Sequence, residues 1–462
     1  MIQSIIIVYL LVILIAGFWK RSETDTESFL FAGRKLTLPA FVATLVTTWY
    51  GGILEVGRVS FEHGISTWVI FGVFYYLAGF IFLKWIAPRI SALNIRTIPE
   101  FIHLKYGKWP GVLAALFVLL LASPAPYIKM AGGMFTFIFH LPEFWAIVMA
   151  AGFSIVYAFS GGFQSVVRTD KLQFILMFGG FGMILIMLVR QYGGADFLLT
   201  HTPDYAFDIP GNFSWSYILI WGFIAMMTFI DPGFYQRCYA GNSDRTVRRG
   251  ILISIGFWVI FDMMSVMTGI YALAILPAGS DNAYLALAET VLSPVFRGIF
   301  FVALLSIIMS TIDSYTFISA FTIGKDIPQL FNPTNSDRSR VNLVRSGLVI
   351  TGIIAIIIAS RFTHVLDIWY TMGTFAVPVL LIPIIGAMYN QKIKYPLLVM
   401  VFPLFVSGIW YAMGMANSLD GWPQYPLSIE PMYPGLLVSG ALFYTFHNKN
   451  PNKHVKNIEV KY

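Results

Sequence analysis

The sequence contains few charged residues, one cysteine and few histidines. Asp, Glu, Lys and Arg make up 11% of the 462 residues, whereas hydrophobic residues make up 57%. With a mean hydropathy of +0.74, this scarcity of charge excludes a soluble globular protein and predicts an all-α integral membrane protein without a soluble domain. The single Cys238 excludes an intrachain disulfide and leaves the redox compartment open.

The sequence also lacks the residue clusters of an intramembrane enzyme and the repeated filter of a channel. An intramembrane hydrolase needs a nucleophile beside a base, or a metal cluster of histidines and carboxylates. The seven histidines are instead scattered, at His63, His103, His140, His201, His364, His447 and His454. No repeated sequence of the kind that lines a symmetric pore is present. A carrier is therefore favoured over an enzyme or a channel.

Apolar runs recur along the whole chain, and most are of about 18 to 25 residues, which is long enough to cross a bilayer. We expect about thirteen transmembrane helices. The runs are 2–18, 36–60, 65–87, 111–139, 143–160, 165–190, 214–240, 250–275, 296–323, 342–360, 365–389, 395–415 and 430–446. The first run is not followed by the small-residue cleavage site of a signal peptide, so we interpret it as a retained span.

Basic residues gather in every second connection between these runs. They are Lys20, Arg21, Arg34, Lys35, Lys84, Arg89, Arg96, Lys105, Lys108, Arg168, Lys171, Arg237, Arg245, Arg248, Arg249, Lys325, Arg338, Arg340, Arg345, Lys392, Lys394, Lys449, Lys453, Lys456 and Lys461. The pattern predicts a multi-pass protein of the plasma (inner) membrane with its amino terminus outside and its carboxyl terminus in the cytoplasm. The net charge of +7 thus belongs to loops and does not predict nucleic-acid binding.

Two of the predicted spans are interrupted by residues that disturb a helix. The second run contains Thr47–Gly52, with two consecutive glycines, and the seventh contains Phe229–Gly233, with an Asp-Pro-Gly sequence. Proline lacks an amide donor and glycine tolerates unusual dihedral angles, so both places can unwind. Unwound backbone at membrane depth is tolerated where it lines a cavity or is buried in protein. A single such break is more often a simple kink.

The two breaks occupy matching positions if the chain contains two five-helix units. Spans two to six and seven to eleven then form units of opposite orientation, because each holds an odd number of spans. Paired breaks in inverted halves are a sequence indication of a transporter's binding site. The predicted organisation is an extra helix and cytoplasmic loop at 1–35, a first repeat at 36–190, an extracellular loop at 191–213, a second repeat at 214–390, and two helices with a basic tail at 391–462.

The apolar run from 300 to 323 carries hydroxyls and one carboxylate at membrane depth. On a helix, Ser310, Asp313 and Ser314 share one face, and Thr311 lies about 100° from Ser310. Hard oxygens without sulfur or imidazole suit a small hard cation such as Na⁺. The alternative is that the hydroxyls bond back to carbonyls four residues earlier, as is common in membrane helices. That alternative does not account for Asp313.

Four segments resemble the sodium/solute symporter family. Ser160–Gln173 is similar to its Gly-Gly…Thr-Asp…Gln signature, and Tyr235–Ala240 to its Gln-Arg…Ala segment. Met309–Thr311 and Gly324–Asp326 resemble its ninth span and the cytoplasmic end of that span. The resemblance implies a leucine-transporter-type 5+5 inverted repeat, preceded by one extra helix, and sodium-coupled symport of a small organic solute by alternating access. A proton-coupled symporter that uses Asp313 or Lys129 is the alternative.

The resemblance also implies where sodium binds. The core site of the family falls on the carbonyls of Val46, Trp49 and Ile307 and the hydroxyls of Ser310 and Thr311. Sialic-acid carriers of the family imply a second sodium site at Asp170, Ser310, Asp313 and Ser314. The alternative for the second set is that Asp170 pairs with Arg168 or Lys171 and that Asp313 is neutral or structural.

The solute site is expected between the two breaks. Its candidate residues are Thr48, Tyr50, Gly51, Lys129, Asp231 and Gly233. Proline carriers have an aspartate where Thr48 stands, which argues against proline. Lys129 is expected to pair with Asp231 or Glu55, or to meet a substrate carboxylate. Glu55 and Arg58, three residues apart, are expected to form a local ion pair. The few polar groups suggest a small solute with charged ends, such as an amino acid or a carboxylate.

Overall fold

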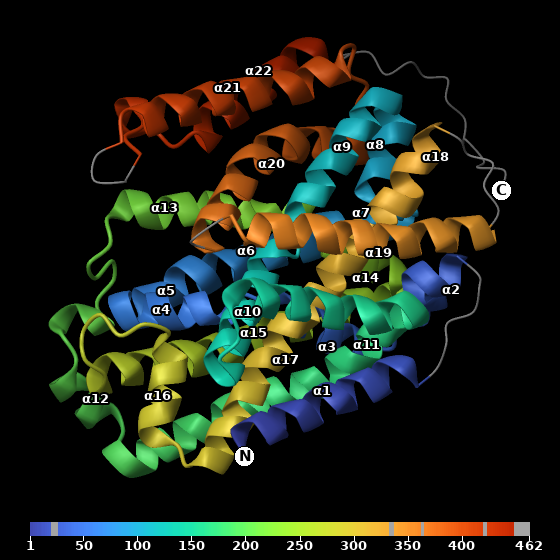
Figure 1. The fold of residues 1–462 in the computed structure, drawn as a ribbon. Helices are drawn as coiled ribbons and strands as arrows, with labels where there is room; N and C mark the ends of the chain where they lie inside the picture. The colour runs from blue at the N-terminus through green and yellow to red at the C-terminus, as the bar shows by residue number, and fades with distance from the viewer. Residues whose placement is uncertain (20–25, 332–336, 362–364, 419–422, 448–462) are drawn as a thin grey trace.

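The computed structural model describes residues 1–19, 26–331, 337–361, 365–418 and 423–447, and these residues fold almost entirely into helices (Figure 1). The first half contains α1 (Ile2–Phe18), α2 (Thr26–Phe31), η1 (Ala32–Arg34), α3 (Leu38–Trp49), α4 (Ile53–His63), α5 (Ser66–Trp68), η2 (Val69–Val73), α6 (Phe74–Ile81), η3 (Phe82–Ile86), α7 (Ala87–Ala92), α8 (Ile98–Tyr106), α9 (Lys108–Leu121), α10 (Ala125–Phe139), α11 (Glu143–Tyr192), α12 (Ala195–His201) and η4 (Asp204–Phe207).

The second half contains α13 (Trp215–Ile224), η5 (Ala225–Ile230), α14 (Pro232–Ala240), α15 (Asp244–Ile275), α16 (Ala283–Val291), α17 (Pro294–Phe321), η6 (Thr322–Asp326), α18 (Ile327–Phe331), α19 (Asp337–Ala359), α20 (Val365–Met388), α21 (Pro396–Ala416), η7 (Pro426–Ser428) and α22 (Met432–Phe446). The predicted positions of Lys20, Arg21, His364, His454 and the basic tail from 448 onward lie outside the described residues.

Nine helices among the described residues are long and apolar enough to cross a membrane, or up to ten if the bent pair of α3 and α4 is one span. Three shorter apolar helices, α1, the first part of α11 at Glu143–Val156 and α22, coincide with further predicted runs. These findings confirm an all-helical protein with multiple candidate spans. The count of about thirteen and the inverted repeat stay predictions.

Helix α17 is the central element of the molecule. It packs against α1, α3, α10, α11 and α19 (Figure 1). Its side chains from Phe300 to Phe321 are all buried. Without a hydrophobic driving force between helices in lipid, close packing and interhelical hydrogen bonds hold such a helix in place. The hydroxyl-bearing middle of α17 therefore faces protein on every side.

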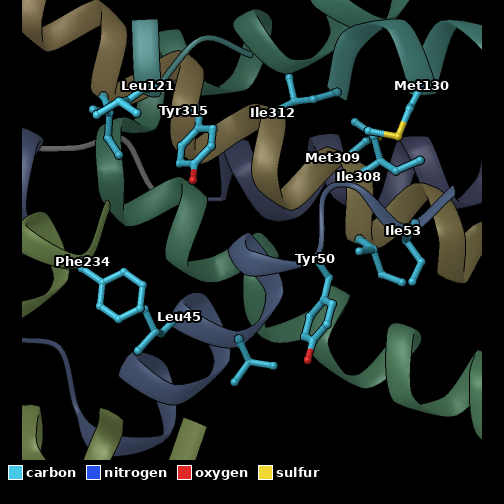
Figure 2. Close-up of a cluster of buried hydrophobic side chains, with 14 of the residues drawn as sticks. Leu45, Tyr50, Ile53, Leu121, Met130, Phe234, Ile308, Met309, Ile312 and Tyr315 are labelled. Carbon is cyan, nitrogen blue, oxygen red and sulfur yellow. The ribbon is translucent and has the colours of Figure 1, made fainter. Parts of the chain in front are cut away.

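The first predicted break separates α3 from α4, which are bent by 56°. Glycine is needed here because a Cβ atom on Gly51 would lie 2.6 Å from Thr311 Oγ1, and one on Gly52 would lie 1.8 Å from the Trp369 ring. The turn therefore lets α17 and α20 approach the backbone closely. Figure 2 shows Tyr50 projecting from this turn among buried apolar side chains.

The second predicted break separates η5 from α14. Asp231 adopts an extended conformation (φ −71°, ψ 115°), and α14 begins at Pro232. Proline suits the first helical position because the amide that it lacks would have no partner there. The Asp231 carboxylate accepts a hydrogen bond from the Phe234 amide at 3.0 Å and so caps α14.

The Gly-Gly sequence that follows residue 160 marks a sharp bend in α11. Gly162 has a positive φ of 57°, and a Cβ atom there would lie 2.6 Å from the Phe29 carbonyl oxygen. The bend divides α11 into a shorter apolar helix, Glu143–Val156, and a candidate membrane span, Gly161–Tyr192, which coincide with two separate predicted runs.

Candidate sodium and solute sites

A buried polar cluster lies where α3, the second part of α11, α14 and α17 meet. Its members are Thr44, Thr47, Thr48, Asp170, Arg237, Ser310, Thr311 and Ser314, and each is at most 7% exposed. Hydroxyls dominate the cluster, and the described residues contain no group of three or more His, Cys, Asp or Glu that could hold a metal ion. Neutral oxygens of this kind suit an alkali cation better than a transition metal.

Asp170 lies on the α11 side of this cluster. Its Oδ1 atom is 2.6 Å from Ser310 Oγ, and its Oδ2 atom accepts a hydrogen bond from the Thr44 hydroxyl. Ser310 Oγ also lies 2.8 Å from Thr47 Oγ1. The carboxylate is therefore held by hydroxyls of α3 and α17, whereas the neighbouring Arg168 donates to carbonyls of α1.

The turn of α17 from Ile307 to Thr311 contacts the broken end of α3. Thr311 Oγ1 donates to the Thr48 carbonyl at 2.8 Å and lies 3.4 Å from the Ile307 carbonyl. Val46 and Trp49 belong to the same last turn of α3, where carbonyls lack amide partners further along the helix. The elements that carry all five expected sodium ligands are thus in contact.

Bonding back along α17 explains only part of the hydroxyl pattern. Ser306 Oγ donates to the Val302 carbonyl at 2.7 Å, as that alternative requires. Ser310 and Thr311 instead make their shorter contacts across to α3 and α11. Ser306 therefore donates within α17, whereas Ser310 and Thr311, one turn later, connect α17 to α3 and α11.

Arg237 and Thr44 are cluster members to which the sequence assigned no role, and Arg237 is the charged one. The charge pattern predicts Arg237 in a cytoplasmic connection, but this prediction is wrong because α14 continues the span and Arg237 is 1% exposed. Its Nη2 atom lies 3.0 Å from Thr44 Oγ1, 2.6 Å from Thr48 Oγ1 and 2.9 Å from Ser314 Oγ. The sequence feature that could have identified Arg237 is its position in the Gln-Arg motif, within the helix that follows the second break.

The residues of the expected second sodium site do not all face one another. Asp170 and Ser310 are in contact, but Ser314 faces Arg237 and Thr48. Asp313 accepts a hydrogen bond at 2.5 Å from Ser154, which lies in the first part of α11. Asp170, on the second part of α11, is thus held by hydroxyls of α3 and α17, whereas Asp313 of α17 is held by the first part of α11, before its bend.

A cavity of about 130 Å³ lies between the two breaks. It is lined by Trp49, Tyr50, Gly52, Val56, Phe71, Tyr75, Tyr127, Trp221, Ile224, Met227, Thr228, Asp231, Asp262, Tyr315 and Trp369. Of the expected solute-binding residues, Tyr50 and Asp231 line it. Thr48 and Gly51 are next to lining residues in the chain, and Gly233 is two residues from Asp231, but none of the three lines the cavity itself.

The hydrogen bonds of the cavity residues fix two carboxylates in its wall. Tyr315 donates to Asp231 Oδ2 at 2.9 Å. Asp262, to which the sequence assigned no role, accepts a hydrogen bond from Tyr76. The Tyr50 hydroxyl donates to the Trp258 carbonyl at 2.9 Å, which holds its ring beside the α3–α4 turn.

Lys129 lies away from this cavity. Its Nζ atom is 2.9 Å from Glu143 Oε1, so the expected pairing with Asp231 or Glu55 is wrong. The reason is helical geometry: Tyr127 of α10 lines the cavity, and a residue two positions later lies on the opposite side of the helix. Glu55 does pair with Arg58 at 2.9 Å, which confirms the local ion pair.

Comparison with known proteins identifies the family of the chain. The model of the sodium:solute symporter family matches residues 29–396. The sodium/glucose cotransporter of Vibrio parahaemolyticus is 26% identical over 402 residues, which cover 76% of this chain and 73% of that protein. The high-affinity proline transporter PutP of Bacillus subtilis (strain 168) is 23% identical over 374 residues, which cover 75% of this chain and 78% of the transporter.

Solved structures show the same fold. A Na⁺-coupled sialic acid symporter in a substrate-bound, outward-open state has a TM-score of 0.80 at 16% identity, with 96% of both chains covered. A nucleobase-cation-symport-1 family transporter in a closed conformation has a TM-score of 0.56 at 12% identity, with 90% of this chain and 95% of that chain covered. At these identities the similarity concerns the fold.

Proposed function

Because the chain belongs to the sodium:solute symporter family, we propose that it couples sodium entry to the uptake of a small organic solute by alternating access. Sodium is proposed to bind at the carbonyls of Val46, Trp49 and Ile307 and the hydroxyls of Ser310 and Thr311. The solute is proposed to bind in the cavity between the two breaks.

The contact between α17 and the broken end of α3 carries this proposal. Thr311 Oγ1 is 2.8 Å from the Thr48 carbonyl, so the hydroxyls of α17 and the last carbonyls of α3 lie within reach of one small ion. Such oxygens replace the hydration shell of Na⁺ without a full negative charge. The ion would join the first unit of the fold to the second, and its release would free them to move apart.

The test is the sodium dependence of uptake in proteoliposomes. Ser310→Ala/Thr311→Ala removes two of about five ligands, so we expect the apparent sodium affinity to fall at least about tenfold, or 1.4 kcal/mol. The matched control is Ser306→Ala, which removes a buried hydroxyl of α17 that donates to the Val302 carbonyl and is not one of the proposed sodium ligands. Sodium dependence that is the same in the double variant and in the control would contradict the proposed site.

Proton coupling is the alternative, and the same vesicles test it. A proton-coupled symporter would take up solute in sodium-free buffer when a pH gradient is imposed. We expect uptake to require inward sodium under all pH gradients, because Ser310 and Thr311 supply hydroxyl oxygens that do not titrate in this range. Uptake driven by protons alone would overturn sodium coupling.

A further inference from the structure

The cavity between the breaks combines acidic groups with aromatic walls. Asp231 and Asp262 both line it, together with six tryptophan and tyrosine rings besides Tyr50. No lysine or arginine is among its lining residues. Its volume of about 130 Å³ is below the range of roughly 300 to 1,000 Å³ that is typical of drug-sized sites, so the occupant is small.

Neither carboxylate forms a direct ion pair within the described part of the chain, and Arg237 acts on Asp231 only electrostatically. Asp231 accepts hydrogen bonds from Tyr315 and from the Phe234 amide, and Asp262 accepts one from Tyr76. None of the ion pairs among the described residues includes Asp231 or Asp262. Carboxyl groups at membrane depth are expensive, and they commonly mark a pathway for a charged ligand or ion.

Arg237 is the basic residue near Asp231, and its hydrogen bonds lead away from the cavity. Its Nη1 atom donates to the Gly233 carbonyl at 3.2 Å, and its Nη2 atom meets Thr44, Thr48 and Ser314. The guanidinium is thus already engaged by the polar cluster. It is not positioned to receive the carboxylate of a solute in the cavity.

The aromatic walls suit a positively charged nitrogen. Tyr127 packs against Tyr315 and Trp369 with ring centroids 5.5 and 6.0 Å apart, and Trp49 packs edge-on against Tyr75 at 5.2 Å. The negative face of an aromatic ring attracts a cation, and cages of such rings recognise quaternary ammonium groups. Rings on both sides of the α3–α4 turn therefore complement the two carboxylates.

A buried hydroxyl provides an independent indication of a ligand. Thr228 lines the cavity and is 1% exposed, and its Oγ1 atom has no hydrogen-bond partner among the described residues. Buried polar groups are nearly always hydrogen-bonded, so an orphan hydroxyl in a cavity wall indicates a missing partner. A ligand with a hydroxyl or an N–H group would satisfy it.

We propose that the solute is a small organic cation, a protonated amine or a quaternary ammonium compound, whose positive nitrogen lies between Asp231 and Asp262 against the aromatic rings. Thr228 hydrogen-bonds the polar end of the solute. This assignment rests on the proposed symport function and differs from the sequence expectation of a carboxylate or an amino acid. A solute carboxylate would find no basic partner in the lining.

The test compares probes that share a shape and differ in charge. Purified full-length protein in detergent is titrated with choline, with ethanolamine and with 3,3-dimethylbutan-1-ol, the neutral isostere of choline, in NaCl and in KCl. We expect at least one of the two cations to bind at least tenfold more tightly than the isostere in NaCl, and to bind more weakly in KCl. Glycine betaine, which adds a carboxylate to the quaternary ammonium group, is expected to bind more weakly than choline.

Two variants test whether the preference for cations over the neutral isostere arises in the cavity. Asp262→Asn should weaken cation binding at least tenfold and leave the isostere unchanged, whereas Glu143→Gln, which removes a carboxylate outside the cavity, should change neither. The comparison of charged and neutral probes on the unmodified protein stands even if Asp262→Asn does not fold.

Two outcomes separate this assignment from the proposed function. If Na⁺ raises the melting temperature of the protein but neither cation binds more tightly than the isostere, the cation assignment is overturned and sodium coupling stands. If Na⁺ changes neither melting temperature nor the binding of any probe, the sodium coupling on which the assignment rests is contradicted as well.

Discussion

Asp170 and Arg237 are opposite charges within one buried cluster of hydroxyls, and the Thr44 hydroxyl contacts both. Thr44 joins them directly, because its hydroxyl donates to Asp170 and accepts from Arg237. A buried charge in a membrane protein needs a partner of opposite sign, and removing one partner leaves the other uncompensated. The guanidinium therefore supplies, from within the chain, a positive charge close to where a second sodium ion was expected.

This arrangement leads to a prediction about stoichiometry. A second sodium ion at Asp170, Ser310, Asp313 and Ser314 would give a Hill coefficient for sodium well above one, falling to about one in Asp313→Ala. Because Arg237 engages Ser314 and Asp313 faces Ser154, we expect a coefficient of about one in both the unmodified protein and the variant. Sodium-dependent uptake in proteoliposomes, with the charge-to-solute ratio, measures it.

A coefficient near two in the unmodified protein, lost in Asp313→Ala while transport persists, would support the second site instead. The control is Ser154→Ala, which removes the hydrogen bond to Asp313 without removing a carboxylate. It should leave the coefficient unchanged if Asp313 has only a structural role.

At the scale of elements, the two breaks bring helix ends of opposite polarity to the middle of the molecule. The carboxyl end of α3 presents carbonyls to α17, and the amino end of α14 is capped by Asp231 beside the cavity. Carbonyls at a helix end carry partial negative charge that favours a cation. Discontinuous helices of this kind build ion and substrate sites in other transporters.

Cysteine accessibility tests whether both breaks face the solute. The only native cysteine, Cys238, is 3% exposed, so the unmodified protein should give a low background with thiol reagents. Tyr50→Cys and Asp231→Cys should react with a small thiol reagent, and the transported solute should protect both positions. The readout is the labelled fraction by mass spectrometry.

Ser254→Cys serves as the control because Ser254 is buried in α15 and does not line the cavity. It should stay unlabelled. If solute protects neither Tyr50→Cys nor Asp231→Cys while uptake persists, the solute binds elsewhere.

At the scale of the whole molecule, α17 is surrounded by helices of both predicted repeats and could couple their movements. The helix contacts α1, α3, α10, α11 and α19. A displacement of its middle would therefore move side chains that pack against elements of both predicted repeats. A sodium ion between α3 and α17 would stabilise one relative placement of these helices. Ligands shift such an equilibrium only by their difference in affinity between the two states.

The orientation in the membrane is a prediction that the fold leaves open. Basic residues in alternate connections predict the amino terminus outside and the carboxyl terminus in the cytoplasm. Epitope tags at the two ends should therefore be protease-accessible from opposite sides of sealed, oriented cells or vesicles. Accessibility of both tags from one side would require an even number of spans and contradict the predicted odd count.

The sequence by itself determined the membrane class, the positions of both breaks and the hydroxyl-rich turn of α17. These follow from local chemistry: apolar length, the backbone freedom of glycine and proline, and the cost of polar groups in lipid. Motifs also indicated the family. The pairs Glu55–Arg58 and Thr48–Thr311 lie within or beside segments that the sequence had already singled out.

Only the tertiary structure decided which charges face one another. Arg237 resembles a loop cation, Lys129 a cavity residue, and Asp262 has no assigned role, but each finds its partner on another helix, which is the next helix for Lys129 and a helix far away in the sequence for Asp262 and Arg237. Glu143 pairs with Lys129, Tyr76 with Asp262, and Thr44 with Arg237. In a chain whose spans are all apolar, hydropathy does not specify how each helix is rotated about its axis. Packing between helices sets that rotation, and with it the acidic, aromatic character of the cavity.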